Sequence, residues 1–359
     1  MLTKLVVGTV AIATLGLVNI APAVADNGPT VVVSGLTGPL QIAVGSDGTI
    51  YADNDFGGTL TAYRGGSSHL VASEPSELAG VDAHGRGTVV YTTTVGDQNG
   101  TTAAALKRVL PNGRVTMLAD IFGWERDHNP DSINTYGVQG LSQECSAAIP
   151  PDFGILPYTG LIDSHAYSVA TVPGGWVVGD AAGNDLVKVD ANGHRSTLAV
   201  LPPVSTVLTQ DDLDANGVTD PFLSSCLLGK TFNSEPVPTD VERGPDGMLY
   251  VSGLSGGIAP GAVYRVNPTT GAVTRIGFGF AGATNLAVAP DGSIYVAELF
   301  GGEISKLVNG GPQQVAQVDF PASVEWAKGK LYASINVFTG GGGEEPIPSN
   351  DAKIVTITP

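Results

Sequence analysis

Gly244-Pro-Asp-Gly-Met-Leu-Tyr250 recurs 45 residues later in the chain as Ala289-Pro-Asp-Gly-Ser-Ile-Tyr295. In both stretches an Asp-Gly pair stands between two short β-like runs, which is the strongest short-range signal for a β-hairpin. Four looser copies of the phrase occur at residues 45–51, 84–91, 172–178 and 327–332. A hairpin that repeats every 40 to 50 residues, roughly, is typical of propeller blades. The six copies therefore predict an all-β fold, a six-bladed β-propeller.

The spacing of the six phrases predicts two insertions. The phrases end at Tyr51, Tyr91, Val178, Tyr250, Tyr295 and Tyr332, so their separations are 40, 87, 72, 45 and 37 residues. Because a bare blade needs about 40 residues, we place insertions at about 122–165 and 203–236. Each insertion contains one of the two cysteines, Cys145 and Cys226. An even cysteine count in an exported protein favours a disulfide. The alternative is two separate thiols that serve as metal ligands, but neither cysteine has the His or Cys partner at close spacing that a metal site needs.

The two ends of the chain predict how the ring of blades closes. Thr30-Val-Val-Val-Ser34 is rich in β-branched residues and has no partner within the first repeat. The last repeat ends at residues 352–358 without a following outer strand. We expect the N-terminal strand to complete the sixth blade, which leaves no blade unpaired and protects the sheet edges.

Residues 1–25 have the pattern of a secretory signal peptide. Lys4 precedes an apolar run over residues 5–18, and Ala21-Pro-Ala-Val-Ala25 supplies the small residues that a signal peptidase reads. We expect cleavage before Asp26, a secreted protein and one propeller domain over residues 26–359. The alternative is a retained membrane anchor, but a polar residue and a proline interrupt the apolar run before the roughly 20 residues that a spanning helix needs.

The composition limits the partners of the mature protein. The chain has 34 acidic and 17 basic residues and a net charge of −17, and removal of Lys4 with the signal peptide makes it −18. Such a surface repels nucleic acid and anionic lipid. We expect a monomer whose partner is a neutral small molecule, a glycan, an envelope protein or a cation, with no nucleic acid and no membrane span.

Polar residues at repeated positions predict a ligand site at one mouth of the central channel. Counting back from each turn gives equivalent inward positions, and the loop after the second strand gives acidic ones, while His165 directly precedes an inner strand. The alternative is that these carboxylates only cap turns and that the histidine is structural. The inward residues are Gln41, Ser168, Asp240 and Asn285, and the acidic ones are Asp53, Asp180 and Glu298. The ligand-binding candidates are His165, Asp53, Asp180, Asp240, Asn285 and Glu298, and the sequence assigns no catalytic residue.

One segment offers a calcium site as an alternative to a helix. Asp212-Leu-Asp-Ala-Asn-Gly-Val-Thr-Asp220 matches positions 1, 3, 5, 6 and 9 of a calcium loop, but Leu223 stands where the bidentate Glu is required. The competing interpretation is a short helix with Thr209 as N-cap, Asp212 as its capping-box acid and Gly217 just past its end. Calcium is therefore the one cofactor that the sequence suggests.

Several stretches resemble the ScyD/ScyE family of exported, NHL-like β-propellers. The most specific is Glu235-Pro-Val-Pro-Thr-Asp-Val241, which the Pro-Asp-Gly phrase follows, and the others are residues 163–169, 179–189 and 285–292. The resemblance covers essentially all of residues 26–359. It implies a propeller and, because family members look to carry both insertion cysteines, it supports the disulfide. It implies no reaction.

Two functions remain open at the level of sequence. The first is a binding or scaffold module in the cell envelope or the medium, with its ligand at the channel mouth. The alternative is a divalent-metal-assisted hydrolase or isomerase of the lactonase or lyase kind. That enzyme would use Asp53, Asp180, Asp240, Asn285 and Glu298 as metal ligands or bases.

Overall fold

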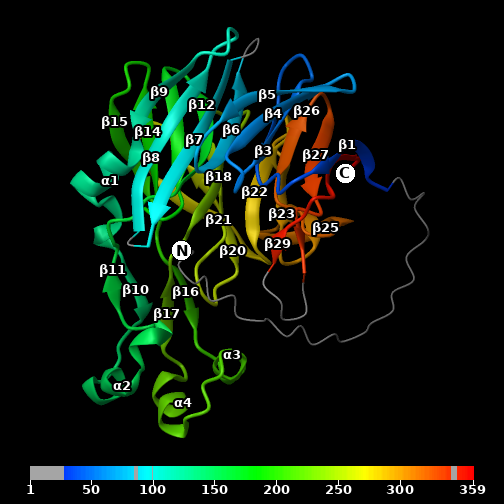
Figure 1. Cartoon of the computed structure of the whole chain (residues 1–359). Coiled ribbons are helices and arrows are strands. Elements are labelled where there is room, and N and C mark those ends of the chain that lie inside the picture. Colours follow the sequence, from blue (N-terminus) through cyan, green and yellow to red (C-terminus); the bar gives the residue numbers. More distant parts are fainter. Residues whose placement is uncertain (1–27, 85–87, 99, 341–345) are drawn as a thin grey trace.

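Strands make up most of the computed structural model, which describes residues 28–84, 88–98, 100–340 and 346–359. The predicted signal peptide lies outside the described residues. In the part of the chain that is described, no helix is long and apolar enough to cross a membrane. The predicted all-β class is confirmed, because the described chain folds mainly into four-stranded antiparallel sheets (Figure 1).

Six of these sheets carry the sequence repeat, and we number them one to six along the chain. In sheets one to five the strands lie in chain order, whereas sheet six has the order β26-β27-β30-β1. Sheet one contains β2 (Ile42–Val44), β3 (Ile50–Asn54), β4 (Thr59–Arg64) and β5 (Ser67–Ser73). Sheet two contains β6 (Glu77–His84), β7 (Thr88–Asp97), β8 (Gly100–Val109) and β9 (Val115–Asp120). Sheet three contains β12 (Ala166–Val172), β13 (Gly175–Asp180), β14 (Asp185–Asp190) and β15 (Arg195–Val200).

The remaining repeat sheets follow the same plan. Sheet four contains β18 (Pro238–Arg243), β19 (Leu249–Gly253), β20 (Gly261–Val266) and β21 (Val273–Phe280). Sheet five contains β22 (Ala283–Val288), β23 (Ile294–Glu298), β24 (Glu303–Val308) and β25 (Gly311–Gln317). Sheet six contains β26 (Val324–Ala327), β27 (Lys330–Ile335), β30 (Ala352–Ile357) and β1 (Thr30–Leu36), and a small hairpin of β28 (Phe338–Thr339) and β29 (Ile347–Pro348) lies between β27 and β30.

The repeated phrase forms the turn between the first two strands of a sheet, as its sequence predicts. In sheet four the Gly247 N–H donates to the Gly244 carbonyl oxygen (3.0 Å) across the turn. Gly247 has a φ of 80°, a left-handed conformation that glycine adopts without steric cost. The glycine of the Asp-Gly pair therefore sets the hairpin.

The first strands of the six sheets contact one another in cyclic order, from β2 through β6, β12, β18, β22 and β26 back to β2. Apolar side chains fill the space between neighbouring sheets. For example, Val177 and Leu186 of sheet three pack with Val251 and Tyr264 of sheet four. Each sheet is thus stabilised by its two neighbours rather than by one central core.

The N-terminal strand pairs with the last strand of the chain. β1 runs antiparallel to β30, with Thr30 opposite Thr356 and Leu36 opposite Ala352. Leu36 packs with Ile354 of β30 and with Ile42 and Ile50 of sheet one. The first described strand therefore bridges the last sheet and the first one.

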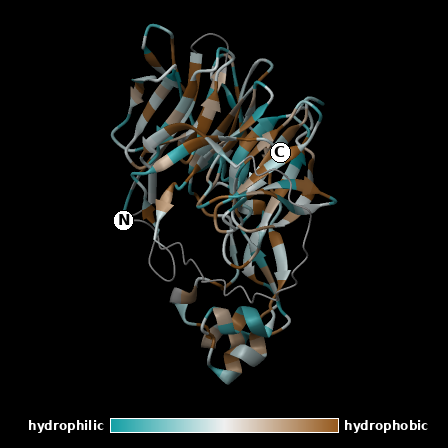
Figure 2. Ribbon diagram, turned by 90° about the vertical axis from the view of Figure 1, so that its right-hand side faces the viewer, coloured by the Kyte–Doolittle hydropathy of each residue, from teal (hydrophilic) through white to brown (hydrophobic). Residues whose placement is uncertain are grey.

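The segments between β9 and β12 and between β15 and β18 leave the repeat and form a lobe. Its four-stranded sheet has the order β11 (Tyr158–Thr159), β10 (Thr135–Val138), β17 (Thr231–Ser234) and β16 (Val204–Val207). Its short helices are α2 (Gln143–Ala148), η2 (Pro151–Phe153), α3 (Gln210–Ala215) and α4 (Pro221–Leu227). In Figures 1 and 2 helices α2, α3 and α4 lie at the lower end of the molecule, away from the six sheets. Two further elements, α1 (Ile121–His128) and η1 (Pro130–Ile133), precede the lobe sheet.

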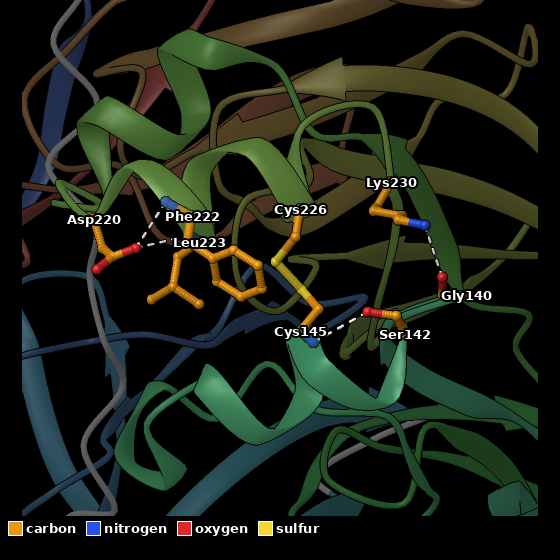
Figure 3. Close-up of a disulfide and its surroundings, with 8 residues drawn as sticks. All are labelled: Gly140, Ser142, Cys145, Asp220, Phe222, Leu223, Cys226 and Lys230. Atoms are coloured by element: carbon orange, nitrogen blue, oxygen red, sulfur yellow. Dashed lines mark hydrogen bonds between the residues drawn. A yellow bond between two sulfur atoms is a disulfide. The ribbon is translucent and has the colours of Figure 1, made fainter.

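A disulfide joins α2 to α4 at the tip of the lobe (Figure 3). The bond between Cys145 and Cys226 confirms the predicted pairing, with 6.1 Å between the two Cα atoms, so the two-thiol alternative is wrong. Both helices have side-chain N-caps: Ser142 Oγ accepts from the Cys145 N–H (3.1 Å), and Asp220 accepts from the Leu223 N–H (2.9 Å). Around the disulfide a small apolar core joins both insertions, and it includes Val138, Ile149, Leu208, Leu213 and Leu227.

The segment that resembles a calcium loop is a helix. Thr209 is the N-cap of α3 and forms a capping box with Asp212, and Gly217 follows the helix with a φ of 70°. Asp220 caps the next helix, α4. The helix prediction is confirmed and the calcium-loop alternative is wrong, because these two carboxylates accept hydrogen bonds from helix N-termini instead of converging on one ion.

Candidate functional site

Three of the predicted site carboxylates have the same structural position. Each lies at the end of the second strand of its sheet and accepts a hydrogen bond from a backbone N–H at or before the first strand of the same sheet. The bonds are Gln41 N–H to Asp53 Oδ1 (3.0 Å), His165 N–H to Asp180 Oδ1 (2.6 Å) and Ala281 N–H to Glu298 Oε2 (2.6 Å). The capping role that the sequence left open is therefore real in all three sheets. Glu298 has no hydrogen bond to the other candidates.

His165 lies between sheets two and three, where it directly precedes β12. Its Nε2 contacts Glu77 Oε1, and its ring meets the edge of Tyr167, with 5.1 Å between ring centres. Burial alone would lower the pKa of His165, but the hydrogen bond and charge of Glu77 raise it above its ordinary value. The histidine is thus held toward its charged form by a carboxylate from the neighbouring sheet.

Two aspartates from sheet one lie close enough to Glu77 to be affected by its charge. Asp53 and Asp55 are both more than nine-tenths buried. Asp53 Oδ2 and Asp55 Oδ1 have no hydrogen-bond partner among the described residues. Burial raises the pKa of both carboxyls well above the ordinary value, and the charge of Glu77 raises it further. Both groups are therefore poised to hold a proton or to meet a positive charge.

Hydrogen bonds from Gln41, next to sheet one, reach across to sheets four and five. Asn285 Nδ2 donates to Gln41 Oε1 (2.9 Å), and Gln41 Nε2 donates to the Thr239 carbonyl oxygen (3.3 Å). Asp240 accepts from the Leu286 N–H (3.1 Å). Burial raises the pKa of Asp240 to about 7, although this backbone donor acts in the opposite direction. The structure thus links Asn285 and Asp53 through Gln41, while Asp240 braces the neighbouring sheet.

Asp180 connects His165 to a second group of acids. Its Oδ2 accepts from Ser164 Oγ (2.5 Å). Asp185, which pairs with it across the β13–β14 hairpin, is 1 % exposed, and neither of its carboxyl oxygens has a partner among the described residues. Burial raises the pKa of Asp185 well above its ordinary value, and the charge of Asp180 adds to the effect.

The first insertion supplies the other two members of this second group. Helix α1 is held against β15 because Trp124 Nε1 donates to Thr197 Oγ1 (3.0 Å), and it brings Glu125 inward. Burial raises the pKa of Glu125 to about 8, helped by the charges of Asp180 and Asp131. Asp131 of η1 is fully buried and accepts from the Tyr136 hydroxyl (3.1 Å) and from Asn184 Nδ2 (3.0 Å). We call Glu125, Asp131, Asp180 and Asp185 the insertion acids.

A pocket of about 400 Å³ opens beside the insertion acids. Tyr158 in its wall donates a hydrogen bond to Glu235 Oε1 (3.0 Å) and packs on Tyr136, with 5.5 Å between ring centres. Burial raises the pKa of Glu235, and the charges of Asp131 and Asp163 raise it further. The pocket is lined by Gly154, Leu156, Tyr158, Leu161, Asp163, Ala182 and Glu235.

Positive charge is scarce in this region. Of the ion pairs between described residues, only the contact of His165 with Glu77 involves a predicted site residue or an insertion acid. Over the same described ranges, no three His, Cys, Asp or Glu residues converge closely enough to hold a metal ion. The region is therefore an acidic pocket without a ready-made metal site.

Sequence reasoning missed most of the insertion acids. Asp185 lies in residues 179–189, a stretch that resembles the family, so the sequence offered a reason to consider it. The same is true of Asp55 in sheet one, which follows the predicted residue Asp53 by two positions. Glu125 and Asp131 had no such local signal, because they lie in an insertion whose fold the repeat does not describe.

Comparison with known proteins gives a match only at the level of structure. No protein-family model and no curated protein matches the chain. An oxidoreductase described as a glucose dehydrogenase from Thermus thermophilus is 17% identical, with a TM-score of 0.55 over 92% of this chain and 99% of that one. A gluconolactonase from Xanthomonas campestris is 10% identical, with a TM-score of 0.52 over 92% of this chain and 95% of that one.

A further solved structure is a catalytically inactive virginiamycin B lyase from Staphylococcus aureus with quinupristin. It is 12% identical, with a TM-score of 0.51 over 92% of this chain and 98% of that one. At identities this low the likeness concerns the fold and not the chemistry. The class that the fold defines is that of all-β, propeller-like proteins.

Proposed function

We propose that the protein is a secreted six-bladed propeller of the ScyD/ScyE type, closed by its N-terminal strand, that acts as a ligand-binding module. The cyclic contacts of the six first strands and the pairing of β1 with β30 support six blades and closure. Three of the four stretches that resemble the family, residues 163–169, 179–189 and 235–241, include Asp180 and Asp185 and three residues of the pocket wall, Asp163, Ala182 and Glu235. Export is supported by the signal-peptide pattern and by the disulfide.

Deleting residues 26–34 should lower the melting temperature, because it removes most of β1 and leaves the edge of β30 unpaired. Circular dichroism melts of the mature protein and of the deletion variant measure the effect. An unchanged melt would remove the closure part of the proposal.

The ligand site is the pocket beside the insertion acids. The observation that carries this assignment is one concave site that combines apolar walls with convergent polar groups, next to carboxyls of raised pKa. Such a combination is typical of small-molecule sites, which range over about 300–1,000 Å³. The two insertions supply most of the pocket wall, while Ala182 comes from the β13–β14 turn of sheet three.

Filling the pocket tests this assignment. A library of small molecules and glycans is first screened for compounds that raise the melting temperature of the wild type. Ala182→Trp places an indole in the pocket, so these compounds should no longer raise the melting temperature of this variant. Ala191→Trp, in the exposed β14–β15 turn of the same sheet, is the matched control and should keep the effect. Compounds that stabilise both tryptophan variants equally would bind elsewhere and contradict the pocket assignment.

A second candidate function is a divalent-metal-assisted hydrolase or isomerase whose site is the predicted channel mouth around His165. Glu125, with its pKa of about 8, and the His165–Glu77 pair are suitable for proton transfer near neutral pH. The gluconolactonase and lyase among the structural neighbours make this class the natural alternative. Calorimetry with calcium and magnesium on the wild type and on Asp180→Asn decides it: metal binding that the substitution abolishes favours the enzyme, and heat-silent titrations disfavour it.

A further inference from the structure

We propose that the pocket recognises an organic cation, a small molecule in which an ammonium or guanidinium group is attached to an apolar body. This inference rests on the proposed function, because it names the chemical class of the ligand for the same pocket. It depends on three features, which are the charged wall, the buried Asp131 near it and the apolar rim.

The wall of the pocket carries two carboxylates and no basic group. Asp163 and Glu235 are both half-buried, and Glu235 is fixed by the Tyr158 hydroxyl. Asp163 Oδ1 accepts from the Ser164 N–H (2.9 Å), which leaves its other oxygen available. No Lys or Arg among the described residues pairs with either carboxylate. Two uncompensated carboxylates in a concave site attract cations and repel anions.

A buried carboxylate near the wall strengthens this field. Asp131 is fully buried and its Oδ1 has no hydrogen-bond partner among the described residues. Asp131 Oδ1 lies against Gly160, where a Cβ atom would approach it to 1.9 Å, and Gly160 directly precedes the pocket residue Leu161. An unpaired polar atom in such a place is costly unless something compensates it. Burial raises the pKa of Glu235 and of Tyr158 in the pocket wall, and the charge of Asp131, which acts on both, raises it further. A cation in the pocket would therefore offset part of that cost.

The apolar part of the site indicates that the cation is organic. Leu156, Leu161 and the ring of Tyr158 line the pocket beside the two carboxylates. Leu161 is 63% exposed and its neighbour Ile162 is 54% exposed, so the rim offers apolar surface to a ligand. Burying that surface favours a ligand with a hydrocarbon or aromatic body, whereas a hydrated metal ion gains nothing from it. An aromatic side chain beside carboxylates is also a common arrangement for ammonium recognition.

Three probes of similar shape and different charge test the inference. 2-Phenylethylammonium, 2-phenylethanol and 3-phenylpropanoate are titrated into the mature protein by calorimetry at low and moderate salt. We expect the ammonium to bind about tenfold more tightly than the alcohol, with weaker binding at higher salt, and the carboxylate not to bind. Glu235→Gln and Asp163→Asn, which keep the side-chain shape, should each weaken the ammonium several-fold and leave the alcohol unchanged.

The controls separate this inference from the proposed function. Glu303 is a half-buried glutamate of sheet five, so Glu303→Gln is the control and should leave the affinity for the ammonium unchanged. Ala182→Trp should abolish binding of the ammonium. Three results would overturn the organic-cation inference. They are equal affinities for the ammonium and the alcohol, an affinity for the ammonium that neither Glu235→Gln nor Asp163→Asn lowers, and no binding of any of the three probes. The assignment of the ligand site to the pocket would still hold if library compounds of another charge no longer bind Ala182→Trp. That assignment would be wrong only if no compound loses binding in this variant.

Discussion

Replacing both cysteines, Cys145→Ala with Cys226→Ala, should lower the free energy of complete unfolding by about 3–4 kcal/mol, the largest effect that we expect from any small change. The disulfide joins residues 81 apart in sequence, and in the chain-entropy model a loop of that length constrains the unfolded chain strongly. The lobe has only a small apolar core to replace that constraint. We therefore expect local unfolding of α2, α3 and α4 while the six sheets persist.

Hydrogen exchange measured by mass spectrometry distinguishes local from global loss. Amides of α2, α3 and α4 should lose protection in the double variant, while amides of β12 and β13 keep theirs. Ser146→Ala, next to Cys145 on the same helix, is the control and should leave protection unchanged. Equal protection of the lobe helices with and without the disulfide would show that their apolar core suffices alone. The pocket would shift with the lobe, because Leu156 belongs to both.

Glu125→Gln should reduce the loss of stability with rising pH. The folded protein holds the pKa of Glu125 at about 8, above its ordinary value of 4.5, so the native state binds the proton more tightly than the unfolded chain. The stability from this group is complete below about pH 4.5 and is lost as the pH rises toward 8. Glutamine stays neutral at every pH. Relative to wild type, the free energy of unfolding of the variant should therefore rise by about 2 kcal/mol between pH 5 and pH 9, a value that includes a reduction for solvent screening.

Urea unfolding at pH 5, 7 and 9 measures this difference. Asp127→Asn changes an exposed carboxylate on the same helix, α1, and should follow the wild type at every pH. Parallel curves for wild type and Glu125→Gln would mean that Glu125 is ionised in the folded protein. In that case a bound cation, and not a proton, would have to neutralise the insertion acids.

The repeat allowed the strands and their turns to be predicted from the sequence because its signals are local. The Asp-Gly turn before Tyr250 needs only the conformational freedom of Gly247. The capping box of Thr209 with Asp212 depends on residues three apart. The disulfide was predictable for a different reason, since Cys145 and Cys226 are the only two cysteines of the chain.

The candidate site was predictable only in part, because it depends on contacts between segments far apart in sequence. Counting along the repeat found Asp53, Asp180 and Asn285, whose strands share one plan. It found neither Glu77, which comes from the neighbouring sheet to reach His165, nor Asp131. Asp131 reaches sheet three only because η1 folds back onto Asn184, and no period in the sequence encodes that contact.

The lobe is made from two segments that are separated by a complete sheet, β12 to β15, and this sets the order in which the protein can be assembled. The chain is synthesised from its N-terminus, so all of sheet three is made after Cys145 and before its partner Cys226. The delay is longer for β1, because its partner β30 is the last strand. The disulfide and the β1–β30 pairing can therefore form only late, after the segments that complete them have been made. A chain cut short anywhere before Ala352 would leave β1 without its partner for the whole of its lifetime.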